Sequence, residues 1–515
     1  MDKKSFEALL HSLSQSARKR LPLPFLKADP DSDEDLLRVY REDDEENNKK
    51  TTPPDSEVID LGCMWAVEFY TPAHMDSLLT NIRRIGWNEE GFRGFKDIED
   101  WAARSREHPK GGGWQNLGTI RSSGTNDSTF GKVHHNALPP PHVSEISGSL
   151  FSVTSSLACI IMMFRLQEES ATGFDTALRT DRETYCTEFS SHSRAIHDPR
   201  VQKIDHVRQI RDEMRSTVTN WFSMNLPGLF SAGLLEGEMP TCEFVSLRET
   251  EPCPNIHQSA PEFLGLLGLR SGIDAWSSVH LPGLKFSPSS WDLSVPQYHS
   301  IFAIKEDDLS DDQLNEAMNW SGREARILYV NNLVMDGPLW LWALLRMLEG
   351  YGKRLGALRE SSMLRLEASH NSVEVLNELA QHVSFGVDIN VVTSDLQNFP
   401  QPKPSYFFRY PSFVPIEVEN YPEGSKLENH LSSLISERAA WIQKMDQSLR
   451  DHGTQYGTLL GARDNVRIQA TISKLTWVLV GLTIILGFLT LRQALTQSKL
   501  CEWLQSAWEV LNVLC

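Results

Sequence analysis

The residues best suited to chemistry are histidines beside a run of prolines. His134, His135 and His142 flank Pro139 to Pro141 in a stretch rich in Gly, Ser, Asn and Pro. Imidazole nitrogens are good metal ligands, but no Cys or carboxylate completes this set at a usual metal-binding spacing. The three histidines alone therefore do not predict a metal site.

A second group of possible metal ligands combines cysteine and histidine, at Cys242, Cys253 and His257. Their irregular separations do not match a zinc-binding pattern. We therefore predict no metal ion and no other cofactor.

Sequence signatures of catalysis are also missing. The chain contains no phosphate-binding loop, no G-x-S-x-G elbow and no H-E-x-x-H helix. Gly265, Gly268 and Gly272 do not match the dinucleotide fingerprint and predict a turn. Asp205 and His206 could act as an acid/base pair only if both faced a cleft, but adjacent helical residues point about 100° apart. No catalytic residue is assigned, and whether the chain is an enzyme stays open.

A basic helix surrounds the Asp205 and His206 pair. Its apolar positions recur at helical spacing and are Val201, Ile204, Val207, Ile210, Met214, Val218 and Trp221. Its cations are Lys203, Arg208, Arg211 and Arg215. We expect these cations to form the solvated face of an amphipathic helix rather than a phosphate site.

The segment that must position these residues, 58–310, alternates between strand and helix patterns. The predicted strands are apolar runs at Leu61–Tyr70, Leu157–Leu166, Cys242–Leu247 and Tyr298–Lys305. Thr71 before Pro72 predicts the start of a helix. Lys110–Val143 predicts a long loop or insertion. We therefore expect an α/β or α+β cytosolic domain over 58–310.

The following region, 311–424, is predicted to be mainly helical. Pro338 can open a helix, and the apolar run Leu339–Leu345 is too short to cross a bilayer, so it predicts a buried core helix. A further helix is predicted over Ser372–His382. An aromatic, proline-rich linker over Phe399–Tyr421 ends the region.

Composition places the bulk of the chain among globular proteins. The chain has 515 residues, enough for two or three domains, with 40% apolar and 23% charged residues. The net charge is -18, and an acidic protein argues against a nucleic-acid partner because phosphate neutralisation needs clustered Lys and Arg. Seven scattered cysteines without paired spacing indicate a reducing compartment.

The N-terminal 57 residues divide into two parts. Residues 1–27 form a basic amphipathic segment without the apolar core of a secretory signal peptide, so we expect the N-terminal bulk to stay in the cytosol. An ordinary terminal helix is favoured there over a membrane-touching one. Residues 28–57 hold twelve carboxylates against four cations, which predicts an acidic disordered linker.

A long stalk helix is predicted over 425–474. Ser425 and Glu428 have the S-x-x-E form of a capping box. The apolar residues that follow lie three, four or seven apart, as in a coiled coil. They are Leu427, Leu431, Leu434, Trp441, Met445 and Leu449. Gly453, Gly457 and Gly461 share one face, which fits a tight oligomer contact or hinge as well as it fits a plain helix break.

The membrane segment is predicted over 475–491. Leu475–Leu491 is a run of 17 residues without a charge, between Lys474 and Arg492. Residues 492–515 form an amphipathic tail whose two glutamates argue against a second span and favour an interfacial helix. The cations before the span slightly favour a cytoplasmic N-terminal side. So late a single span is typical of tail-anchored proteins.

A cytosolic domain, a helical stalk and a C-terminal span resemble the layout of CorA-like divalent-cation channels over about the last 90 residues. The resemblance implies ion transport. Those channels carry a Gly-Met-Asn signature at the end of the first span, followed by a second span. Here the corresponding place reads Leu491-Arg492-Gln493, and no second span follows.

Three functions remain as hypotheses. The first is a membrane-anchored, non-enzymatic sensing or partner-binding module that forms homo-oligomers through its stalk, with a protein partner that the sequence does not identify. The second is a membrane-tethered enzyme of unfamiliar type in residues 58–310. The third is a divergent CorA-like channel in which Thr476, Thr483 and Thr490 line a pore at seven-residue spacing.

Overall fold

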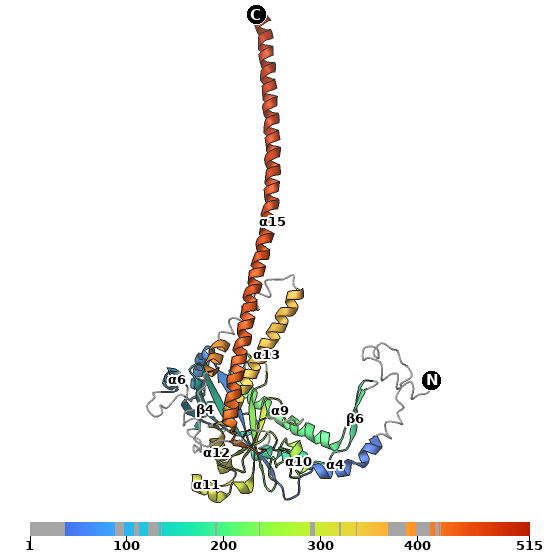
Figure 1. The fold of residues 1–515 in the computed structure, drawn as a ribbon, viewed down its shortest axis with the longest axis vertical. Helices are drawn as coiled ribbons and strands as arrows, with labels where there is room; N and C mark the ends of the chain where they lie inside the picture. The colour runs from blue at the N-terminus through green and yellow to red at the C-terminus, as the bar shows by residue number, and fades with distance from the viewer. Residues whose placement is uncertain are drawn as a thin grey trace, which may run out of the picture. The chain divides into compact units, whose positions relative to one another are not determined.

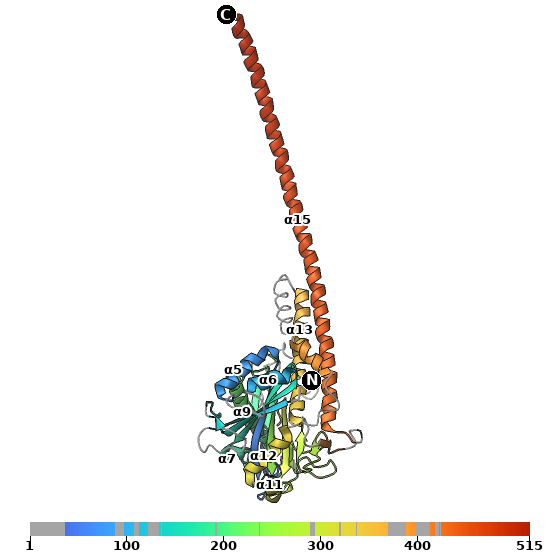
Figure 2. The ribbon, with the colours of Figure 1, turned by 90° about the vertical axis from the view of Figure 1, so that its left-hand side faces the viewer.

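Strand β1 (Ile59–Tyr70) lies in the middle of a ten-stranded mixed sheet, between β5 (Leu157–Leu166) and β8 (Thr241–Leu247). Every residue of β5 and β8 is buried, as expected for apolar strands that are covered on both faces. Both neighbours pair with β1 in antiparallel fashion, whereas β8 and β11 (His299–Lys305) are parallel. The sheet is visible in Figure 2 of this computed structural model.

The structure describes residues 37–87, 97–107, 113–121, 133–134, 136–190, 193–235, 237–288, 294–318, 321–335, 337–368, 388–397, 413–417, 422 and 424–514. The chain divides into two units, one of residues 1–357 with 387–443 and the other of residues 358–386 with 444–515. The whole sheet belongs to the first unit.

The sheet has the strand order β12-β9-β10-β11-β8-β1-β5-β4-β2-β3. The remaining strands are β2 (Gly113–Arg121), β3 (Val133–His134), β4 (Val143–Thr154), β9 (Trp276–Ser278), β10 (Lys285–Ser287) and β12 (Phe413–Pro415). Strands β6 (Tyr185–Ser190) and β7 (Ser193–His197) form a separate antiparallel pair.

Helices pack on both faces of the sheet. Those before α11 are α4 (Asp44–Thr51), α5 (Met75–Ile85), α6 (Ile98–Glu107), α7 (Glu168–Ala171), α8 (Gly173–Arg179), α9 (Pro199–Asn225) and α10 (Glu262–Leu266). The later ones are α11 (Asp311–Met318), α12 (Gly322–Met335), α13 (Pro338–Ala368) and α15 (Leu427–Leu514), and two 3-10 turns lie at Pro72–His74 and Glu306–Asp308.

Alternation along the strands decides which helix each side chain meets. Trp65 of β1 donates its indole N–H to Asn331 of α12, with 2.8 Å between Nε1 and Oδ1. The next residue back, Met64, pairs in register with Glu243 of β8, and Glu243 contacts α9. Helices α12 and α9 therefore cover opposite faces of the central strands.

A buried carboxylate ties the loop after α9 to β1. Glu68 is fully buried, and its two oxygens accept the backbone N–H groups of Phe69, Phe230 and Ser231 at 2.7 to 2.9 Å. Burial raises the pKa of Glu68, while these N–H groups oppose that rise. A Cβ on Gly228 would lie 2.5 Å from the Glu68 side chain, so the loop needs glycine there.

The coarse fold predicted from the sequence is confirmed, since a mixed sheet with helices precedes a mostly helical C-terminal part. All four predicted strands are present as β1, β5, β8 and β11. The buried helix predicted at Leu339–Leu345 is confirmed within α13, where the seven residues are at most 7% exposed. The predicted helix over Ser372–His382 and the N-terminal segment 1–27 lie outside the described residues.

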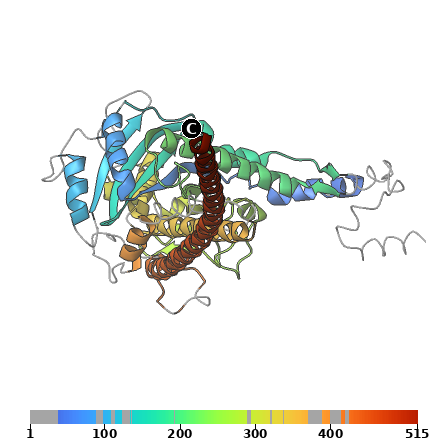
Figure 3. The same ribbon diagram turned by 90° about the horizontal axis from the view of Figure 1, so that it is seen from above.

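Two predictions are wrong in part. The acidic linker contains helix α4, because Asp44 accepts hydrogen bonds from Thr184 and Asn48 bonds the Arg182 backbone. The stretch predicted as a loop over Lys110–Val143 contains β2 and β3, which extend the sheet by pairing with β4 and with each other. Figures 1 and 3 show α4 beside α9.

The capping box at Ser425 and Glu428 is also wrong. The Ser425 amide and hydroxyl both donate to the Pro422 carbonyl, and Glu428 accepts the backbone N–H of Phe413 in β12. The Glu428 carboxylate is thus hydrogen-bonded to the edge strand β12 and not to the start of its own helix, which begins at Leu427.

Helix α15 is one continuous helix of 88 residues, so the alternative of a plain break at the three stalk glycines is excluded. Within it, Asn465–Asn512 is long and apolar enough to cross a membrane, and a window of 18 residues in this segment has a mean hydropathy of 2.0. None of that segment is buried inside the chain, which weakly suggests a membrane anchor.

Candidate functional site

Helix α9 positions most of the chemically capable residues of the first unit. Asp198 caps its N-terminus by accepting the backbone N–H of Val201 at 2.7 Å, and Pro199 occupies the first helical turn. Because 3.6 residues make one turn, Lys203, Arg211 and Arg215 lie along one side of the helix.

The expectation that these cations form a solvated face is wrong for three of the four. Lys203 and Arg211 are 0% exposed and Arg215 is 6% exposed, while Arg208 faces solvent. Arg211 and Arg215 face strand β8, which carries the buried carboxylate Glu243. Lys203 faces the end of α4, where it donates to Thr52 Oγ1.

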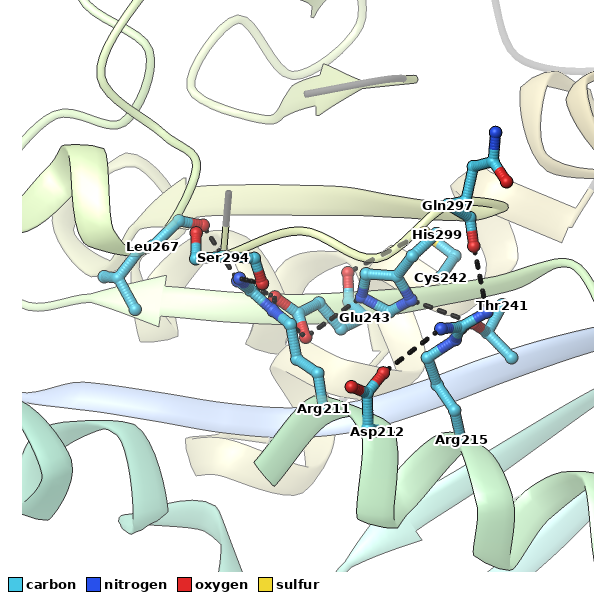
Figure 4. A network of polar contacts seen from close by, with 10 residues as sticks. All are labelled: Arg211, Asp212, Arg215, Thr241, Cys242, Glu243, Leu267, Ser294, Gln297 and His299. Carbon is cyan, nitrogen blue, oxygen red and sulfur yellow. Dashed lines mark hydrogen bonds and ion pairs between the residues drawn. The ribbon is translucent and has the colours of Figure 1, made fainter. Parts of the chain in front are cut away.

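Arg211 is held by partners on every side (Figure 4). Its Nε lies 3.0 Å from Glu243 Oε1, and its Nη2 lies 2.6 Å from the same oxygen. The backbone carbonyls of Ser294 and Leu267 accept its other N–H groups at 2.9 and 2.8 Å. A guanidinium this well bonded fastens α9 to β8 and to two loops.

A second chain of contacts joins Arg215 to the same carboxylate (Figure 4). Arg215 Nε donates to Thr241 Oγ1 at 3.0 Å, and Thr241 Oγ1 lies 2.8 Å from His299 Nδ1. His299 Nε2 in turn lies 3.1 Å from Glu243 Oε2. Because an ionised carboxylate can only accept, the proton of a neutral imidazole sits on Nε2 facing Glu243, and the Thr241 hydroxyl then donates to Nδ1.

The charge states follow from burial and neighbours. Burial opposes ionisation of Glu243, but Arg211 and His299 overcome it and lower the pKa of Glu243 to about 2. Burial lowers the pKa of His299 against the opposing pull of Glu243, so the imidazole is neutral at pH 7. Burial also lowers the pKa of Lys203 to about 8, where the ammonium donates to Thr52 Oγ1 at 2.9 Å.

This network is closed, because Arg211, Glu243 and His299 are at most 2% exposed. No substrate can reach it without local unfolding. Its chemical role is therefore to fix α9 and the strands beneath it, and the accessible chemistry lies on a different side of the helix.

That side borders a cavity of about 320 Å³. Its floor is apolar and includes Met64, Val143, Leu166 and Val218, all at most 3% exposed. Ile210 and Met214 of α9 form a half-exposed wall. The predicted apolar positions of α9 thus divide between the core and the cavity.

Polar residues surround the mouth of the cavity. They are His142, Glu169, Ser170, Glu213 and Thr217. His142 has a φ of 69°, a left-handed conformation that is uncommon for a residue with a side chain. Its Nδ1 lies 3.1 Å from Ser170 Oγ, and its carbonyl accepts the Gln167 N–H at 3.0 Å.

Among the sequence candidates whose side chains the structure describes, His142 lies at this mouth and Asp205 lines an adjoining hollow. His206 instead accepts from Arg182, with 2.7 Å between Nη2 and Nδ1. Cys242 and Cys253 are buried, whereas His257 is exposed, so this trio shares no single environment. Within the described part of the chain, no three His, Cys, Asp or Glu residues gather as metal ligands would.

Sequence reasoning missed Glu243 and Glu213. Glu243 sits inside an apolar strand, which was a usable signal because a carboxylate there needs a buried cation. Nothing in the sequence connected Glu213 to Glu169, which line the same cavity from α9 and α7.

Comparison of the whole chain with protein-family models, with curated proteins and with solved structures finds no match.

We predict that neutral, buried His299 makes the protein sensitive to mild acid. In the unfolded protein, His299 has its ordinary pKa of 6.5, whereas burial lowers its pKa in the folded protein. The unfolded state therefore binds more protons as the pH drops below 6.5, and the free energy of unfolding decreases. For each unit by which the pH drops, this single group lowers the free energy of unfolding by at most about 1.4 kcal/mol. The apparent Tm of His299→Gln should therefore fall less between pH 7.5 and 5.5 than that of the unsubstituted protein.

His257→Gln, at an exposed position, is the matched control and should leave the pH profile unchanged. Burial lowers the pKa of His74 and His206 as well, so part of the acid sensitivity should persist in His299→Gln. Equal Tm losses in His299→Gln and the unsubstituted protein would contradict the assignment.

Proposed function

We propose that this protein is a membrane-anchored, non-enzymatic binding module with its N-terminal bulk in the cytosol. The observation that carries the proposal is the segment Asn465–Asn512, a helix apolar enough to span a bilayer with none of its length buried by the chain itself. Trp477, Leu482, Ile485 and Phe488 are each at least 53% exposed. In water so much exposed apolar surface is unfavourable, and in lipid it is not.

The binding part of the proposal rests on the first unit. Its interior is fixed by the closed network around Arg211, and a preformed, largely apolar cavity opens beside that network. Ligand sites are commonly of this kind, with apolar walls and a few polar groups. A rigid supporting frame also favours binding, because less order must be created when the ligand arrives.

Self-association through the stalk is the third part. Gly457 and Gly461 lie one turn apart on α15, and a Cβ added to either would meet no heavy atom within 4 Å. Small residues spaced by four allow a second helix to approach closely. Leu459, Val466 and Ile468 are 55 to 67% exposed and would be covered in such an assembly.

The channel alternative gains less support. Thr476, Thr483 and Thr490 donate their hydroxyl protons to carbonyls four residues earlier in α15, at 2.7 to 2.9 Å. These are the ordinary bonds of threonine within a helix and give no sign of a pore, although each hydroxyl oxygen keeps lone pairs that a cation needs.

The enzyme alternative has one specific observation in its favour, the contact of His142 with Ser170 at the mouth of the cavity. A hydroxyl beside an imidazole is the minimal activated nucleophile. Turnover of a bound ester that stops in both Ser170→Ala and His142→Gln would establish it over simple binding.

The membrane anchor predicts that the full chain resists alkaline extraction from membranes. Cutting before Leu475 should release the protein into the soluble fraction. Leu482→Arg should raise the extracted fraction severalfold, because an arginine at the centre of a span costs about 2.5 to 3.5 kcal/mol.

Leu459→Arg is the matched control, since it changes the same helix at another exposed leucine, outside the predicted span. It should remain in the membrane pellet. Equal extraction of the full chain and of the version cut before Leu475 would refute the anchor.

The stalk predicts an oligomer in mild detergent, measured as particle mass by light scattering after gel filtration. Replacing both Gly457 and Gly461 with Ile should lower the mass to that of one chain, because the added side chains keep two helices apart. Thr458→Ile, on a neighbouring exposed face, should leave the oligomer intact. A monomeric unsubstituted protein would exclude this part of the proposal.

A further inference from the structure

We infer that the cavity beside α9 binds a small amphipathic cation, with an apolar body and a protonated amine. The inference rests on the binding part of the proposed function and does not depend on the membrane anchor. It names a ligand class for a cavity whose size, lining and charge are all defined within the first unit.

The volume and the apolar floor of the cavity indicate that the ligand has an apolar body. Its volume of about 320 Å³ lies within the range of about 300 to 1,000 Å³ that is usual for small-molecule sites. The floor contains Met64, Leu166 and Val218, which are at most 3% exposed. An apolar group placed there would lose its contact with water, which is favourable in proportion to the area covered.

The positive charge is indicated by the mouth. Glu169 and Glu213 both line the cavity and are exposed, and the described residues around it include no lysine or arginine. Glu213 also borders an adjoining hollow of about 680 Å³, together with Asp205 and Asp212. The cation in that hollow, Arg208, lies 3.8 Å from Asp212, so its charge is opposed by a carboxylate.

The cavity is held open rather than closed by side chains. Gly173, the first residue of α8, lines it, and a Cβ built on Gly173 would lie 3.7 Å from Ile210 Cδ1 across the space. A single methyl group would fit there in ordinary contact, but an aromatic ring would occupy the ligand volume. His142, in its left-handed conformation, lies beside Ser170 and forms part of the rim.

Three indole probes of similar size test the inference. Tryptamine carries an ammonium, tryptophol a hydroxyl and indole-3-acetate a carboxylate on a short arm. Their dissociation constants are measured by titration calorimetry at pH 7 with the full chain in lipid nanodiscs, using empty nanodiscs as the blank. Tryptamine should bind about fivefold more tightly than tryptophol, the contribution of an exposed ion pair, and indole-3-acetate should bind most weakly.

Two variants separate the apolar and charged contributions. Gly173→Phe should abolish binding of all three probes, while the matched Gly173→Ala should retain it. Glu169→Gln combined with Glu213→Gln should lower the affinity for tryptamine to that for tryptophol. The affinity for tryptophol should not change. Because those two glutamates are exposed, this variant remains informative even if Gly173→Phe does not fold.

Equal affinity for the three probes would overturn the proposed charge preference, and so would a tryptamine preference that survives the double glutamate variant. Absence of binding to the unsubstituted protein, or undiminished binding to folded Gly173→Phe, would overturn the site itself. None of these results changes membrane extraction, so failure of this inference is distinguishable from failure of the membrane anchor.

Discussion

The burial of Arg211 is the constraint on which the first unit depends. A guanidinium taken out of water is costly unless its N–H groups all find acceptors, and removing a partner leaves an uncompensated charge. Glu243 and the carbonyls of Ser294 and Leu267 supply those acceptors. Because these partners come from β8 and from two separate loops, the side chain fits only when all of them are in place. One buried cation thereby sets the position of α9, and α9 in turn forms one wall of the cavity.

The sequence predicted the elements whose signal is local. Strands β5 and β8 are continuous apolar runs, and the candidate span is a long uncharged one, so both were recognisable from a short window. Strand β4 was missed because its sequence, VSEISGSLFSVT, mixes small, polar and apolar residues, although all but one of them are buried. Its polar side chains are accommodated by the neighbouring strands, and that compensation is not visible in a window of one strand.

The candidate site was less predictable for the same reason. The cations of α9 were predicted to form a solvated face because Glu243, the partner of Arg211, lies 32 residues further along the chain. The predicted capping box at Ser425 and Glu428 does not form because the Glu428 carboxylate accepts the backbone N–H of Phe413 in β12. The cavity combines residues of β1, β5, α7 and α9 with the segment before β4, and no spacing rule connects them. Among the early candidates whose side chains the structure describes, His142 lies beside it.

The central claim is that α15 crosses a membrane and separates the sheet-containing unit from the C-terminal end. Two native cysteines report on it, the half-exposed Cys186 before the span and the exposed Cys501 after Leu491. In sealed vesicles treated with a membrane-impermeant maleimide and analysed by mass spectrometry, a spanning helix predicts modification of one cysteine and protection of the other until detergent is added. Equal modification of Cys186 and Cys501 in intact vesicles would contradict the claim.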